Sequence, residues 1–178
     1  MNAMEIKQLA IEDALYLSEY YLQNAEHLCP WERKVEDDFH EVEAWQQRLK
    51  IREKEQVEGR SSYFVAYLND PKKIIATCSL TGITQGAFMA CFMGYSVALS
   101  YEGQGVMKNL CQHAISYAFN ELQLNRIMAN YMPSNQRSQK LLTSLGFVKE
   151  GFAKKYLFIN GRWEDHIMTS LVNPTNRD

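Results

Sequence analysis

The feature that most constrains this fold is an apolar segment followed at once by a glycine-containing turn and a helical pattern. Phe88–Leu99 reads FMACFMGYSVAL and is apolar on both faces, as expected for a strand at the centre of a sheet. SYEGQG occupies residues 100–105, and the apolar residues of 107–122 then recur at helical spacing. A strand, two glycines and a helix in this order predict an α/β fold, in which helices flank a central sheet.

The other periodic segments predict a mixed central sheet with flanking helices. The Asn160-Gly161 pair joins two strand-like segments and is a strong hairpin signal. No repeat or linker-like segment interrupts the 178 residues, so we expect a single domain over residues 1–178. The first third reads as helical before the first strand. The predicted helices are 11–25, 36–57 and 134–145, and the further predicted strands are 61–68, 74–81, 126–131, 148–159 and 162–171.

Composition excludes several classes of protein. The chain has 19 basic and 21 acidic residues, a net charge of −2, so we expect no direct sequence-specific nucleic-acid binding. No apolar segment approaches the ~20 residues that span a bilayer, and the N-terminus lacks a signal-peptide pattern, so we expect no membrane association. The four cysteines, Cys29, Cys78, Cys91 and Cys111, contain no CxxC pair. We interpret them as reduced thiols in a cytoplasmic protein and expect no metal site.

The turn before the predicted helix suits an anion. The first backbone N–H groups of a helix have no partner within it, and the helix dipole is positive at that end. Gly103 and Gly105 would let a ligand approach the backbone, which favours a phosphate or pyrophosphate. The alternative is that both glycines only form the turn. No Gly-Lys-Ser/Thr follows, and Lys108 stands where a dinucleotide fingerprint has its third glycine.

This junction resembles the acetyl-coenzyme A motif of GCN5-related N-acetyltransferases, Gln/Arg-x-x-Gly-x-Gly/Ala. The resemblance implies that the loop amides bind the coenzyme pyrophosphate and that the preceding strand binds the pantetheine arm. Glu102 and Met107 depart from the motif, and we expect the Glu102 side chain to turn away from the pyrophosphate. The cofactor-binding residues implied here are Val97, Ala98, Leu99, Gly103, Gln104, Gly105, Val106 and Met107.

A second stretch also resembles the family. Asn135 and Ser138 precede Leu145-Gly146-Phe147, which implies that Asn135 contacts the pantetheine and that Ser138 lies near the thioester sulfur. The alternative is that Ser134 and Asn135 only cap the helix. Lys140 is a further candidate for a coenzyme phosphate.

Longer blocks resemble the RimJ-type branch, whose members acetylate the N-terminal alanine of a small-subunit ribosomal protein. These blocks are 30–32, 90–96, 126–133 and 165–166. The resemblance implies an acetyl-CoA-dependent transferase, a basic ribosomal protein as acceptor and a possible association with ribosomes. Two alternatives stay open, namely a small-molecule amine as acceptor and a non-enzymatic ribosome-assembly partner.

The resemblance implies direct transfer from the thioester to a neutral amine. In a related branch a glutamate near the penultimate strand takes the proton, and Leu157 stands at that position here. We therefore predict Glu32 as the catalytic base, with a solvated carboxylate or an ammonium-binding group as alternatives. Ser138 is predicted to hydrogen-bond or protonate the departing sulfur, with a helix cap or a pantetheine contact as the alternative. A backbone N–H near Val97 is the implied oxyanion donor.

The acceptor cleft is predicted from the same resemblance. Its candidate residues are His27, Trp31, Glu32 and Tyr95. For each of these the alternative is ordinary packing, and we interpret His166 as structural.

Overall fold

The computed structural model describes residues 4–69 and 72–175. Within them, seven strands form one mixed sheet in the order β1-β2-β3-β4-β5-β7-β6. Neighbouring strands are antiparallel except for the parallel pair β4 and β5. The strands are β1 Met4–Gln8, β2 Ser62–Asn69, β3 Lys72–Thr84, β4 Ala90–Val97, β5 Arg126–Met128, β6 Val148–Ile159 and β7 Arg162–Val172.

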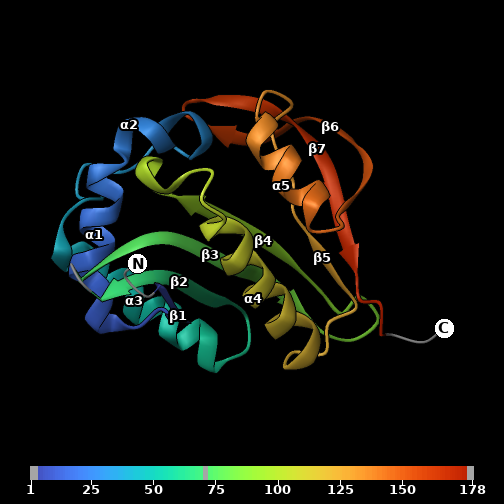
Figure 1. Cartoon of the computed structure of the whole chain (residues 1–178), viewed down its shortest axis with the longest axis horizontal. Helices are drawn as coiled ribbons and strands as arrows, with labels where there is room; N and C mark the ends of the chain where they lie inside the picture. Colours follow the sequence, from blue (N-terminus) through green and yellow to red (C-terminus); the bar gives the residue numbers. More distant parts are fainter. Residues whose placement is uncertain (1–3, 70–71, 176–178) are drawn as a thin grey trace.

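Helices cover both faces of the sheet (Figure 1). Phe64 and Val65 are neighbours on β2 but belong to different apolar cores, because successive side chains of a strand point to opposite faces. The core around Leu17 and Trp45 packs α1 and α3 on one face, and the core around Leu110 packs α4 and α5 on the other. The helices are α1 Ala14–Gln23, α2 Ala25–Leu28, α3 Val42–Val57, α4 Val106–Asn120 and α5 Gln136–Ser144, with short 3-10 turns η1 Ile11–Asp13, η2 Cys29–Trp31 and η3 Leu99–Tyr101.

Two expectations for the first third were wrong. Strand β1 was not expected, because five residues carry little periodic signal and its formation depends on antiparallel pairing with β2, with Met4 opposite Leu68. The second long helix begins at Val42 rather than at residue 36. Residues 37–40 form a turn instead, in which Phe39 is buried against Trp45.

The central strands are shorter than the sequence predicts. Strand β4 ends at Val97, and Leu99 lies in η3, 57% exposed. Only one face of β4 is fully packed, since Cys91 is buried whereas Phe92 is 40% exposed. Strand β5 ends at Met128 instead of residue 131. The remaining predicted helices and strands are present with shifts at their ends.

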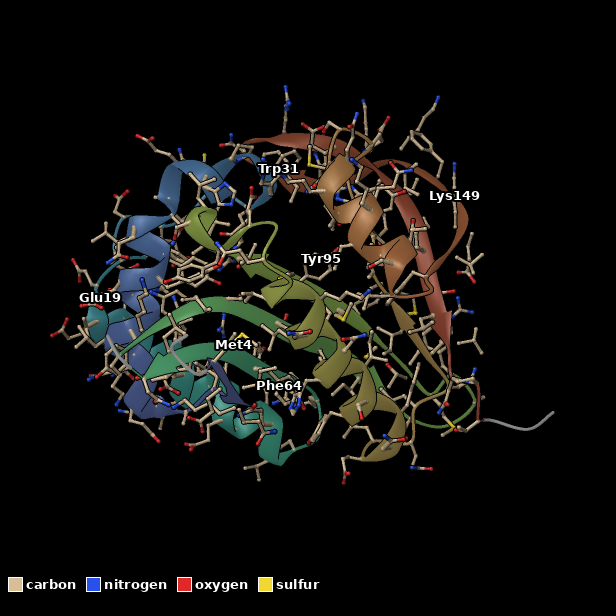
Figure 2. All side chains as sticks on the ribbon, viewed as in Figure 1. Met4, Glu19, Trp31, Phe64, Tyr95 and Lys149 are labelled. Atoms are coloured by element: carbon tan, nitrogen blue, oxygen red, sulfur yellow. The ribbon has the colours of Figure 1, made fainter. Side chains whose placement is uncertain are left out.

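The shortness of β5 opens the sheet. Strands β4 and β5 pair over three positions, from Ala90 with Arg126 to Phe92 with Met128. Residues 93–97 of β4 continue without a β5 partner in the described part of the chain. The sheet therefore has an open edge beside the second half of β4, in the region where Figure 2 shows Tyr95 between α4 and α5.

Three further sequence expectations concern cysteines, a turn and membrane spans. All four cysteines are free thiols, with Cys29 exposed and the other three buried. The predicted turn at 69–71 includes Asp70 and Pro71, which lie outside the described residues. None of the helices in the described ranges is long and apolar enough to span a bilayer.

Candidate active site

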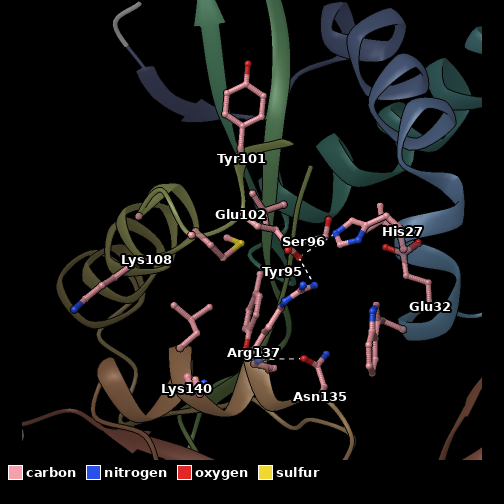
Figure 3. A pocket seen from close by; sticks show the side chains of 18 residues that line it. His27, Glu32, Tyr95, Ser96, Tyr101, Glu102, Lys108, Asn135, Arg137 and Lys140 are labelled. Carbon is pink, nitrogen blue, oxygen red and sulfur yellow. Dashed lines mark hydrogen bonds and ion pairs between the residues drawn. The ribbon is translucent and has the colours of Figure 1, made fainter. Parts of the chain in front are cut away.

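Two cavities meet beside the open edge of β4. The larger has a volume of about 670 Å³ and lies along the turn between β4 and α4 (Figure 3). The smaller has a volume of about 340 Å³ and reaches towards β6 and β7. Six residues line both cavities and therefore form their common boundary: Trp31, Glu32, Tyr95, Ser96, Asn135 and Ser138.

The glycine turn at the start of α4 borders the larger cavity. Gly103 and Gly105 have φ angles of +70° and +79°, a left-handed conformation that L side chains rarely adopt. A Cβ at either position would meet no atom within 4 Å, so the backbone conformation rather than crowding by the protein favours glycine here. Gly105 is the N-cap of α4, and the unpaired first amides of the helix lie at this cavity.

Half of the predicted cofactor residues of this segment line the cavity. They are Val97, Gly103, Gly105 and Met107. The other four, Ala98, Leu99, Gln104 and Val106, are not among the lining residues. The Ala98 N–H donates to the Ile75 carbonyl oxygen of β3 at 2.9 Å, and the Leu99 N–H donates to Asn24 Oδ1 at 3.0 Å. These two amides hold the end of β4 in place.

Glu102 has two partners in the wall of the larger cavity. It lines the cavity, and its carboxylate accepts a hydrogen bond from Arg137 Nη1 at 2.8 Å and lies 3.4 Å from His27 Nε2. The carboxylate can remain there because the Arg137 guanidinium compensates its charge. Lys108 and Lys140 are the other cationic residues in this wall.

Sequence reasoning missed Arg137 and Lys108. Arg137 lies between Asn135 and Ser138, so its place inside the second family-like stretch was a usable signal. Lys108 directly follows Met107 and lies in the first turn of α4. Both are exposed, and an exposed basic residue has by itself little diagnostic value.

Ser138 makes one hydrogen bond with Asn135 and one with Tyr95. The Asn135 side-chain oxygen accepts the Ser138 N–H at 3.0 Å, so Asn135 caps α5. Ser138 Oγ lies 2.6 Å from the Tyr95 hydroxyl oxygen. Asn135 and Ser138 both line the common boundary, so the capping role of Asn135 is compatible with a ligand contact.

Glu32 carries the one carboxyl group among the six residues of this boundary. Burial raises its pKa to about 7, and the nearby Arg33 lowers it by a smaller amount. Its backbone carbonyl oxygen accepts the Asn160 N–H at 2.9 Å, which ties the loop after η2 to the β6–β7 hairpin. A carboxyl group with a pKa near neutrality can accept a proton at physiological pH and release it again.

Two further residues considered in the sequence analysis, Leu157 and His166, line the smaller cavity. Leu157 lines it, so the position that carries a glutamate in the related branch faces this space with an apolar side chain. His166 lines it as well and is buried, with Nδ1 3.1 Å from the Glu164 carbonyl oxygen. Trp31 borders both cavities, whereas His27 borders only the larger one and is paired with Glu102.

In the described part of the chain, no group of three or more His, Cys, Asp or Glu is arranged to hold a metal ion.

Comparison with known proteins identifies the family. The model of the acetyltransferase (GNAT) domain matches residues 4–148. The chain is 42% identical over 163 residues to the [Ribosomal protein uS5]-alanine N-acetyltransferase of Escherichia coli, which covers 91% of this chain and 84% of that protein.

Two solved structures are similar over nearly the whole fold. The ribosomal-protein-S5-alanine acetyltransferase of Vibrio fischeri superposes with a TM-score of 0.95 at 40% identity, covering 100% of this chain and 97% of the other. Mycobacterium smegmatis RimJ, in complex with CoA-disulfide, superposes with a TM-score of 0.88 at 29% identity, covering 95% and 81%. The glycine turn, the opened sheet and these similarities together place the chain in the GNAT family of acetyl-CoA-dependent N-acetyltransferases.

Proposed function

We propose that this enzyme acetylates the α-amino group of an N-terminal alanine on a small-subunit ribosomal protein, in the cytoplasm. The observation that carries the proposal is the common boundary of the two cavities. It brings Glu32, Tyr95 and Ser138 to the point where a thioester in one cavity would meet an amine in the other. The activity named for the E. coli relative supports the choice of acceptor.

The larger cavity fits coenzyme A in shape and charge. The unpaired amides at the start of α4 suit the pyrophosphate, and Lys108 and Lys140 suit its negative charge. The pantetheine arm would follow the open edge of β4. Successive N–H groups of a strand point to opposite edges, and the Ala98 N–H points to β3. The Val97 N–H therefore faces the open edge, where it can donate to the thioester oxygen.

The smaller cavity fits the acceptor amine. An α-amino group has a pKa of ~7.7–8.0 and a lysine side chain ~10.4, so deprotonation at pH 7 costs roughly 1–1.4 kcal/mol for the former and roughly 4.6 kcal/mol for the latter. Glu32, with its pKa of about 7, is a base of matching strength for an α-ammonium group and a weak one for lysine. The acetyl group is supplied by the thioester, and the proton of the acceptor passes to Glu32.

The non-enzymatic alternative rested on Glu102 and on the missing glutamate at Leu157. Arg137 compensates the charge of Glu102, and Glu32 supplies a carboxyl group to the cavity that Leu157 lines. Both departures from the family pattern are therefore compatible with catalysis. Association with ribosomes would be a further consequence of the proposed acceptor.

The acceptor is tested with synthetic peptides that carry the first residues of a basic ribosomal protein. We expect acetyl-CoA-dependent thiol release and a mass increase of one acetyl group with an N-terminal alanine. The matched control is the same peptide with a blocked N-terminus and one internal lysine. A faster reaction with that control, or with spermidine, would contradict the proposed acceptor.

Replacing Ser138 with alanine tests the proposed donor to the leaving sulfur. We expect kcat to fall by about 10- to 100-fold, whereas the KM for acetyl-CoA changes by less than about twofold, because the hydrogen bond is made mainly to the developing thiolate. The backbone N–H of residue 138 still meets Asn135, so the helix start is preserved. Steady-state kinetics with varied acetyl-CoA gives both constants, and a raised KM at constant kcat would make Ser138 a binding residue.

A further inference from the structure

We propose that Tyr95 is a positioning residue, which donates its hydroxyl hydrogen to Ser138 Oγ and thereby directs the Ser138 proton at the coenzyme sulfur. This inference rests on the proposed role of Ser138 in acetyl transfer. The supporting geometry is the 2.6 Å separation between the two hydroxyl oxygens at the common boundary of the two cavities. The pair connects β4 with α5 across the opened sheet.

Ser138 is held by two hydrogen bonds, one to its backbone and one to its side chain. Its backbone N–H is fixed by the Asn135 side chain at 3.0 Å, and its oxygen is fixed by the Tyr95 hydroxyl. Tyr95 is itself fixed, since it lies opposite Cys78 in the β3–β4 register and its ring packs against the core beneath α4. Figure 3 shows the Tyr95 ring extending towards the start of α5, near Asn135 and Arg137.

The direction of the hydrogen bond follows from what each hydroxyl must do. A serine hydroxyl has one proton and two acceptor lone pairs. If Ser138 donated to Tyr95, no proton would remain for the sulfur, whereas a hydrogen bond from Tyr95 leaves the Ser138 proton free. Burial raises the pKa of Tyr95, so its hydroxyl stays protonated and remains a donor. Accepting this bond also makes the Ser138 O–H a stronger donor, because consecutive hydrogen bonds polarise one another.

The transfer step needs no proton from either hydroxyl. The nitrogen–carbon bond forms, and the carbon–sulfur bond breaks with its electron pair on sulfur. The acceptor ammonium group has by then given one proton to Glu32, and the second proton, which the nitrogen loses on forming the amide, passes to water. Ser138 donates a hydrogen bond to the thiolate, and Tyr95 donates one to Ser138. In this step Tyr95 therefore acts through Ser138.

A double-mutant cycle tests this assignment. We expect Tyr95→Phe to lower kcat by about 5- to 10-fold with the KM for acetyl-CoA nearly unchanged, because the ring keeps its packing and only one hydrogen bond is lost. In the Ser138→Ala background the same change is expected to lower kcat by less than about twofold. If Tyr95→Phe lowered kcat in the Ser138→Ala background as much as it does in the wild type, the assignment would be overturned, since Tyr95 would then act independently of Ser138.

The control variant is Tyr117→Phe. Tyr117 lies on α4 with its ring 5.1 Å from that of Phe64, and it lines neither cavity. We expect its kcat to equal that of the wild type. A loss equal to that of Tyr95→Phe would mean that the cycle reports general loosening of this core, and the assignment would fail.

A binding measurement separates this inference from the proposed acceptor. Coenzyme A and desulfo-coenzyme A, which lacks the sulfur, are compared by isothermal titration without any amine. We expect the wild type to prefer coenzyme A by about fivefold, the worth of one hydrogen bond, and both Tyr95→Phe and Ser138→Ala to abolish this preference. An unchanged preference in Tyr95→Phe would overturn the inference. If the preference is lost but no peptide is acetylated, the acceptor is wrong and the inference about Tyr95 stands.

Discussion

Replacing Glu32 with glutamine is expected to lower kcat/KM for an alanine-starting peptide by about 100-fold at pH 7, the lower end of general-base contributions. The reason is the position of this carboxyl group between the two cavities, where burial raises its pKa to about 7. The expected loss in kcat/KM is at the lower end of the general-base range because about a tenth of α-amino groups are already neutral at pH 7 and need no base. Steady-state kinetics at fixed, saturating acetyl-CoA measures the effect.

The pH profile gives the more specific part of this prediction. The base form of Glu32 is the carboxylate, which predominates above its pKa of about 7, so wild-type kcat/KM should rise with pH through that value. In Glu32→Gln this step should disappear, and the remaining rise should follow the amine, near ~7.7–8.0. The gap between the two proteins should therefore shrink above pH 8, where the amine is already deprotonated.

The matched control for this experiment is Glu26→Gln. Glu26 lies on the neighbouring helix α2, is exposed and lines neither cavity. Its variant should keep the wild-type profile. If Glu32→Gln instead raised only the KM for the peptide and kept the step near pH 7, Glu32 would bind the ammonium group without taking its proton.

Replacing Gly105 with aspartate is expected to weaken coenzyme A binding by more than about 100-fold, because a carboxylate would face the pyrophosphate at the start of α4. Gly105 is the N-cap of this helix, and the turn that it forms borders the larger cavity. Isothermal titration with acetyl-CoA and with coenzyme A measures the change. Binding within about tenfold of wild type would show that the pyrophosphate lies elsewhere.

Two control variants separate charge from backbone strain. Gly105→Asn has nearly the same size as aspartate without its charge, and asparagine tolerates a left-handed φ comparatively well. It should therefore retain most of the affinity that aspartate abolishes. Gly59→Asp introduces the same residue at φ +68° with no atom within 4 Å, after α3 and outside both cavities. This variant should bind coenzyme A normally.

Features that depend on a few neighbouring residues could be predicted from the sequence. The glycine turn before α4, the Asn160-Gly161 hairpin and the helix stop at Gly146 follow from backbone conformations that glycine and asparagine favour. Helix α4 follows from its apolar spacing. The boundaries of β4 and β5 could not be predicted, because an apolar pattern does not reveal where a neighbouring strand stops pairing.

The chemistry of the site depended on contacts between distant residues. The Tyr95–Ser138 pair spans 43 positions of sequence, and the Glu102–Arg137 pair spans 35. Nothing in the sequence indicated the cation that compensates Glu102, because Arg137 lies on α5. No local pattern determines such distances.

The sequence by itself thus determined the family, the glycine turn and the candidate residues, since local backbone preference and motif spacing are properties of short segments. Tertiary structure alone decided which of those residues meet. It placed Glu32 in the boundary between the cavities and raised its pKa to about 7. The physical reason is that desolvation and hydrogen bonding depend on every group packed around a side chain, and folding brings those groups together from distant parts of the chain.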